Sequence, residues 1–113
     1  MTPNKTIEIV DRLKPNAYGE EDKLRWIDEL DGMVQRLVFQ EKESDIKRYA
    51  YPDDMDTELL IGAPYENLYA LYLEAKIDYY NHEYANYNNA AMMFEGQFGE
   101  YKKAYIREHR AKG

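Results

Sequence analysis

The sequence predicts an all-α protein of about four helices. Apolar residues recur every three or four positions in four segments, which is the spacing of one helix face, and prolines, glycines and clusters of turn-forming residues separate these segments. The 113 residues suit a single domain, which can bury a core without disulfides or metals. We therefore expect one helical domain over residues 1–113, in which the last two helices form an antiparallel pair and a long loop occupies about residues 41–62.

The first predicted helix begins near Thr2 and ends at a proline. Thr2 is a favourable N-cap, and Pro3 suits the first helical position, where its missing N–H would have no partner in any case. Pro15 then ends the helix near Leu13. The apolar side chains of this segment form one short stripe, so the helix needs a partner face to be stable.

The second predicted helix covers about residues 20–39. It opens with three acidic residues at 20–22, and negative charge is favourable at a helix N-terminus. Gly32 lies inside the helix and weakens it by about 1 kcal/mol relative to alanine, so it either marks a point where another helix crosses closely, which we favour, or is simply tolerated. A long apolar stripe defines the helix: Leu24, Ile27, Leu30, Val34, Leu37 and Val38.

Between residues 41 and 56 the helical periodicity disappears and turn-forming residues dominate, before a brief apolar run that ends at Gly62. Loops longer than about 12 residues are commonly functional. This connection is therefore the first candidate for contacts with a partner or with another subunit. The side chains that we single out there are Tyr49, Tyr51, Asp53, Asp54, Asp56, Leu59, Leu60 and Ile61.

The last two predicted helices run from Pro64 to about Asn81 and from about residue 84 to Arg110. We expect Asn81 to adopt the left-handed conformation that ends the third helix. Gly96 and Gly99 lie inside the fourth helix, where they would allow a kink or a close backbone approach, and beyond Arg110 we expect fraying. The fourth helix has the most regular pattern of the chain, with alternating spacings of three and four: Tyr84, Tyr87, Ala91, Phe94, Phe98, Tyr101 and Tyr105.

The composition excludes several classes of function. Fifteen basic and 22 acidic residues give a net charge of −7, which disfavours direct binding to nucleic acids and to anionic membranes. The absence of cysteine excludes disulfides and thiol chemistry. We find neither a membrane-spanning apolar run nor a signal-peptide pattern. Twelve tyrosines suit half-buried helix faces and protein interfaces, because each combines an apolar ring with a polar tip.

The residue types of known catalytic and metal sites are present, but not in the required patterns. His82 and His109 are the only histidines, and neither belongs to a zinc motif. A calcium loop starting at Asp53 would need glycine and glutamate where Glu58 and Pro64 stand. No acidic residue stands inside an apolar stretch that would obviously raise its pKa. We therefore expect no enzymatic activity, no cofactor and no bound metal.

Several segments of the chain have a distinctive sequence. In the predicted third and fourth helices these are Tyr-Glu-Asn-Leu-Tyr (65–69), Tyr-Leu-Glu-Ala-Lys-Ile-Asp (72–78) and Tyr-Ala-Asn-Tyr-Asn-Asn (84–89). In the second helix the segment is Glu-Glu-Asp-Lys-Leu-Arg-Trp-Ile-Asp-Glu-Leu (20–30). These segments resemble head–tail connector proteins, also called adaptor or neck proteins, of siphophages and Gram-positive prophages. The resemblance extends over most of the chain, although its motifs are packing patterns and carry no catalytic residue.

The resemblance implies a structural role in the virion. Connector proteins assemble as a ring beneath the portal protein, extend the channel for the genome DNA and provide the surface on which tail or neck proteins dock. The implied location is the virion neck, and the host cytoplasm during assembly. An acidic channel would let DNA pass without binding it. We expect the 41–62 connection to contribute to one of the two surfaces by which neighbouring subunits of a ring touch.

Two other classes of function remain open. A helical protein-binding adaptor, or an acidic prophage regulator that mimics DNA, would be a stable monomer or dimer that binds a basic protein tightly. An enzyme would show a concave pocket that contains a carboxylate of raised pKa. A connector would instead bind the portal protein and form higher-order rings.

Overall fold

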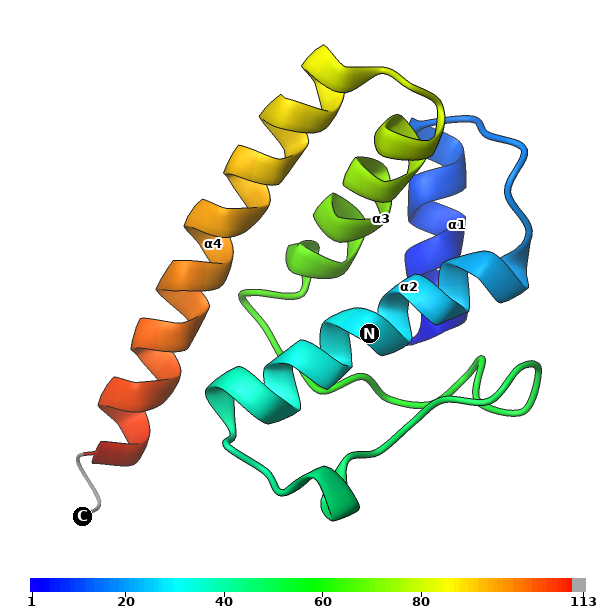
Figure 1. The fold of residues 1–113 in the computed structure, drawn as a ribbon. Helices are drawn as coiled ribbons and strands as arrows, with labels where there is room; N and C mark the ends of the chain where they lie inside the picture. Colours follow the sequence, from blue (N-terminus) through cyan, green and yellow to red (C-terminus); the bar gives the residue numbers. More distant parts are fainter. Residues whose placement is uncertain (111–113) are drawn as a thin grey trace.

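The computed structural model describes residues 1–110 and confirms the all-α class (Figure 1). This part of the chain contains four α-helices and no β-strand. They are α1 (Pro3–Leu13), α2 (Glu20–Met33), α3 (Asn67–Tyr80) and α4 (Tyr84–Arg110). A π-helical turn, Val34–Val38, continues α2, and a short 3₁₀ turn covers Glu43–Asp45. The fraying expected beyond Arg110 lies outside the described residues.

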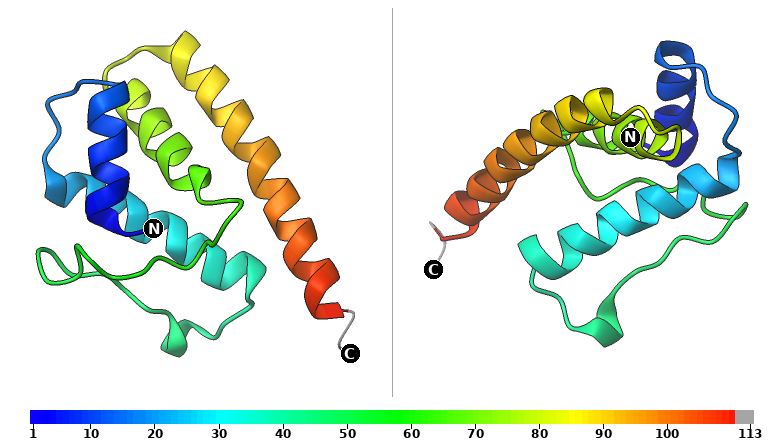
Figure 2. Two further views of the ribbon diagram at one scale, coloured as in Figure 1. Left: turned by 180° about the vertical axis from the view of Figure 1, so that it is seen from behind. Right: turned by 45° about the horizontal axis from the view of Figure 1, so that its top comes forward.

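Helix α3 lies between α1 and α4, and α2 crosses this layer (Figure 1). As the sequence predicts, α3 and α4 run antiparallel, and they lie side by side in Figure 1 and in the left view of Figure 2. Helix α4 is almost twice as long as α3, so its C-terminal half extends beyond the start of α3 and approaches the π-helical turn. The 41–62 connection passes along the side of α2 that lies opposite to α4 (Figure 2).

The first helix has the bounds that its sequence signals predict. The hydroxyl of Thr2 accepts a hydrogen bond from the backbone N–H of Lys5 at 3.2 Å, and Pro3 occupies the first helical position. Ile7 and Val10 are buried against the other helices. Local capping residues therefore determine the position of α1, and its apolar stripe determines the face that it buries.

No other helix of the described residues approaches Gly32, Gly96 or Gly99 closely, so the close crossing that we favoured at Gly32 is wrong and the alternative, a tolerated glycine, agrees with the structure. A Cβ atom added at Gly32 would meet only the guanidinium of Arg36, 2.8 Å away on the same helical segment. At Gly96 and Gly99 an added Cβ would find nothing within 4 Å. Another helix does not approach these glycines within one subunit, because α4 packs on α3 with a different face.

Helix α3 ends near Asn81 as the sequence predicts, but its start and its left-handed capping residue differ from the expectation. Around Pro64, backbone hydrogen bonds between residues three positions apart, such as Leu68 N–H to Tyr65 O at 3.0 Å, form turns. The α-helix therefore begins only at Asn67. At the other end the left-handed residue is His82, with φ of 61°, and not Asn81. The N–H of Glu83 reaches Asp78 O at 2.9 Å and that of His82 reaches Tyr79 O at 3.1 Å, the paired bonds of a Schellman cap.

The aromatic residues of α4 pack on its neighbours along the whole helix. Ring centroids lie 5.2 Å apart for Phe94 and Tyr72 of α3, and 4.9 Å apart for Tyr105 and Phe39, which follows the π-helical turn. Tilted contacts of this kind are favourable beyond the area they bury. One core contains residues from all four helices and from the connection, including Trp26, Leu30, Met55, Leu59, Ile61, Leu68, Tyr69, Leu73, Ile77 and Phe94.

Candidate functional site

The 41–62 connection is held against α2 by three polar side chains on one helix face, Asp28, Asp31 and Gln35. Gln35 pairs with the backbone of Lys47 in both directions: its amide oxygen accepts the N–H at 2.7 Å and its amide nitrogen donates to the carbonyl at 3.1 Å. The carboxylate of Asp28 accepts hydrogen bonds from the guanidinium of Arg48 at 2.8 Å and from the N–H of Tyr49 at 2.9 Å. These contacts fix the backbone of residues 47–49.

Asp31 is fully buried and is the centre of this anchor. Its carboxylate accepts hydrogen bonds from the hydroxyls of Tyr49 at 2.5 Å and of Tyr69 at 2.6 Å, and from the N–H of Leu60 at 3.3 Å. The Tyr69 hydroxyl in turn accepts from the N–H of Ile61 at 2.8 Å. One carboxylate therefore joins α2, α3 and both ends of the connection.

The surroundings of Asp31 raise its pKa, which corrects the expectation that no acidic residue would be so placed. Burial raises the pKa of the carboxyl, although the hydrogen bonds from Tyr49, Tyr69 and Leu60 act against this. Burial and the adjacent carboxylate also raise the pKa of Tyr49 and of Tyr69. Both phenols therefore remain protonated and donate hydrogen bonds at neutral pH. Asp31, Tyr49 and Tyr69 together act as a structural anchor.

The side chains that the sequence singled out in the connection divide into buried and exposed sets. Leu59 and Ile61 belong to the core, Leu60 is half-buried, and the Tyr49 hydroxyl is bound to Asp31. Asp54 and Asp56 accept hydrogen bonds from within the chain, at 2.7 Å each, from Ala50 N–H and from the Asn4 side chain. The side chains left exposed to a partner are Tyr51, Asp53 and Asp56.

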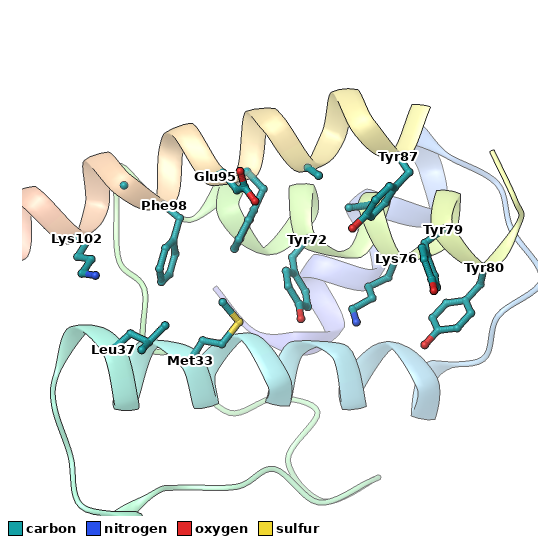
Figure 3. Close-up of a pocket in the computed structure, with 14 residues that line it drawn as sticks. Met33, Leu37, Tyr72, Lys76, Tyr79, Tyr80, Tyr87, Glu95, Phe98 and Lys102 are labelled. Atoms are coloured by element: carbon teal, nitrogen blue, oxygen red, sulfur yellow. The ribbon is translucent and has the colours of Figure 1, made fainter. Parts of the chain in front are cut away.

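A second candidate site, which the sequence did not indicate, is an open groove between α2, α3 and α4 (Figure 3). Its volume is about 860 Å³. Figure 3 shows Met33 and Leu37 projecting from the α2 side toward Tyr72 of α3 and Phe98 of α4. Most of the lining is aromatic or aliphatic: Met33, Leu37, Tyr72, Ala75, Lys76, Tyr79, Tyr80, Tyr87, Ala91, Phe94, Glu95, Phe98, Gly99 and Lys102.

The three charged residues that line the groove, Lys76, Glu95 and Lys102, differ in their contacts. The ammonium of Lys76 lies 3.0 Å from the carboxylate of Glu29, which also accepts a hydrogen bond from Tyr72 at 3.1 Å. Lys76 is thus held at the α2 side. Glu95 and Lys102 are exposed on α4, and neither forms an ion pair with a side chain of residues 1–109.

The groove and the buried carboxylate are separate features. The groove is lined by Met33 and Leu37, whereas Asp28, Asp31 and Gln35 project from the opposite side of the same helical segment. Figure 3 shows the connection on the side of α2 away from the groove. The carboxylate of Asp31, whose pKa is raised, therefore does not line the groove.

Comparison with protein-family models, with curated proteins and with solved structures finds no significant match to this chain. Within residues 1–110 no three histidine, aspartate or glutamate side chains are grouped closely enough to hold a metal ion. None of the described helices is both long and apolar enough to cross a bilayer.

Proposed function

We propose that this chain is a structural, protein-binding domain that acts as a head–tail connector, joining the portal of a phage head to the tail. The observation that carries the proposal is the presence of two different surfaces on opposite sides of α2. One is the exposed part of the connection, around Tyr51 and Asp53, and the other is the apolar groove. Head-to-tail assembly into a ring requires two such unlike surfaces on each subunit.

The connection suits a docking surface because it is ordered before a partner arrives. Asp28, Asp31 and Gln35 hold its backbone, so binding through Tyr51 or Asp53 would not have to immobilise a flexible loop. Tyr51 is 44% exposed, and tyrosine is enriched in protein interfaces. A partner would therefore meet a preformed surface with one aromatic ring and at least two carboxylates.

The charge of the chain is compatible with a channel for DNA. The net charge of −7 repels phosphates, and Asp53 and Asp56 are exposed on the connection. If the 53–58 segment lines the channel, replacing its acidic residues by their amides should increase DNA retention and lower infectivity. Unchanged retention and infectivity would show that these residues do not line the channel.

The decisive experiment begins with the genes on either side of this one. A portal gene among them provides the protein to purify, and the connector role predicts rings of this chain on that portal by electron microscopy. Tyr51→Ala combined with Asp53→Asn should prevent assembly, whereas Glu8→Gln, on the exposed face of α1, should not. Flanking metabolic or regulatory genes, or no ring together with tight binding to a basic protein, would favour the adaptor or DNA-mimic alternative.

A further inference from the structure

The groove side of α4 is chemically complementary to itself. Ala91, Glu95, Gly99 and Lys102 all line the groove, and their spacings of four, four and three residues place them along one side of the helix. We propose that a second copy of this chain occupies the groove with its own α4, so that free subunits form an antiparallel, twofold-symmetric pair. This inference concerns the free subunit, before the groove is used in a ring, and goes beyond the connector role.

The charges determine where the twofold axis passes. With the axis between Phe98 and Gly99, Glu95 of one subunit lies opposite Lys102 of the other, and the symmetry repeats this ion pair. The same axis places Ala91 opposite Ile106, a small side chain against a large one. Glu95 and Lys102 are the exposed charges of the groove that lack an ion-pair partner among the side chains of residues 1–109. In an isologous contact of this kind the Glu95–Lys102 ion pair forms twice, once on each side of the axis.

The shape of α4 permits the approach of a second helix at this position. An added Cβ at Gly96 or at Gly99 would find nothing within 4 Å, so the space outside both glycines is open. Packed helices with small residues at the contact reach separations of about 8 Å. Ala91 and Ile106 are 15 residues apart, which at 1.5 Å per residue gives a contact about 22 Å long.

The same chain also carries the apolar side chains that would fill the groove of a partner. Met92 is 72% exposed and Ile106 is 42% exposed on α4, while Leu37 is 50% exposed at the groove wall. Methionine adapts its shape to irregular spaces. Pairing would remove these side chains from water on both subunits, which offsets the repulsion between two chains of charge −7.

Sedimentation equilibrium of the wild-type chain over a range of concentrations tests the pairing, and charge variants test its geometry. The wild type should form dimers. Glu95→Lys and Lys102→Glu each place like charges opposite one another, so each should weaken dimerisation at least about tenfold, the effect of 1.4 kcal/mol. An equal mixture of the two variants should form heterodimers, because each then meets its opposite charge, and the double variant should recover homodimers.

Matched controls separate this effect from a change in net charge. Glu8→Lys and Lys5→Glu make the same charge changes on the exposed face of α1 and should leave dimerisation unchanged. A wild type that remains monomeric, or a dimer that Glu95→Lys does not weaken, would overturn the proposal, as would a mixture that gives no heterodimer. Rings formed on a portal by a chain that is monomeric when free would refute this pairing and leave the connector proposal intact.

Discussion

The hydroxyl of Tyr69 lies 2.6 Å from a carboxylate oxygen of Asp31, although the two residues are 38 positions apart in the sequence. This contact joins α3 to α2 inside the core. The hydroxyl also accepts the N–H of Ile61, and the same carboxylate accepts the hydroxyl of Tyr49. Tyr69 and Asp31 therefore determine how the connection is attached to the helices.

Removing the Tyr69 hydroxyl should destabilise the protein without opening a large cavity. Tyr69→Phe leaves the buried carboxylate of Asp31 with one donor fewer and the N–H of Ile61 without its acceptor. We expect the free energy of unfolding to fall by about 1–3 kcal/mol, the cost of unsatisfied buried groups. Urea denaturation followed by circular dichroism measures this, with Tyr51→Phe, an exposed tyrosine, as the control. Equal stability of the two variants would contradict the role given to the hydroxyl.

The raised pKa of Asp31 predicts an unusual pH dependence. The folded protein holds this proton more tightly than the unfolded chain, so the contribution of Asp31 to stability is fully present below its ordinary pKa of 3.8 and is lost as pH rises through the folded-state value. The difference in unfolding free energy between wild type and Asp31→Asn should therefore change in favour of the wild type as pH falls. Urea titrations at several pH values measure it, and a difference independent of pH would refute the prediction.

The two hydrogen bonds between Gln35 and the backbone of Lys47 should slow the exchange of amide hydrogens with solvent in this part of the connection. Gln35→Ala removes the acceptor of the Lys47 N–H and the donor to its carbonyl. We expect this N–H to exchange roughly fivefold faster, corresponding to about 1 kcal/mol of lost local stability. Hydrogen exchange measured by NMR tests this, and the N–H of Glu83, bonded to Asp78 at the α3 cap, provides the internal reference. Equal acceleration at both sites would indicate global destabilisation instead.

The turn between α3 and α4 should tolerate glycine at one position only. His82 has φ of 61°, a conformation that costs an L-residue about 1–2 kcal/mol. His82→Gly should therefore stabilise the protein by up to about 1 kcal/mol, less what is lost with the contact to the Tyr84 hydroxyl. Asn81→Gly should destabilise it, because Asn81 has an ordinary φ of −86°. Thermal unfolding of both variants tests the assignment, which a reversed order would refute.

Features set by neighbouring residues could be predicted from the sequence. Thr2, Pro3 and Pro15 define α1, and the apolar stripe defines α2 together with the π-helical turn that extends it. Asp31 and Gln35 fall on that stripe, seven residues after Leu24 and eight after Ile27, and this was the signal that could have identified them as buried. Their role depends on partners 12 to 38 residues away, which no local pattern contains.

The groove could not be predicted, because it arises from the relative placement of three helices. Its aromatic lining on α3 and α4 resembles ordinary packing in the sequence, and only the divergence of α2 from α4 leaves part of it uncovered. The sequence-based prediction places the left-handed residue at Asn81, one position before His82, for a different reason. Asparagine favours that conformation, but the cap geometry, with Glu83 bonded to Asp78, requires it at His82.

The anchor at Asp31 also has a consequence for the order of events when the chain folds. The donors to its carboxylate come from the connection and from α3, so the complete set of hydrogen bonds at Asp31 forms only after α2 and α3 have packed together. These long-range contacts close a large loop, which makes them late to form. Because Tyr49, Leu60 and Tyr69 share one carboxylate, the segment should detach as a single cooperative unit, and proteases would find it either closed throughout or open throughout.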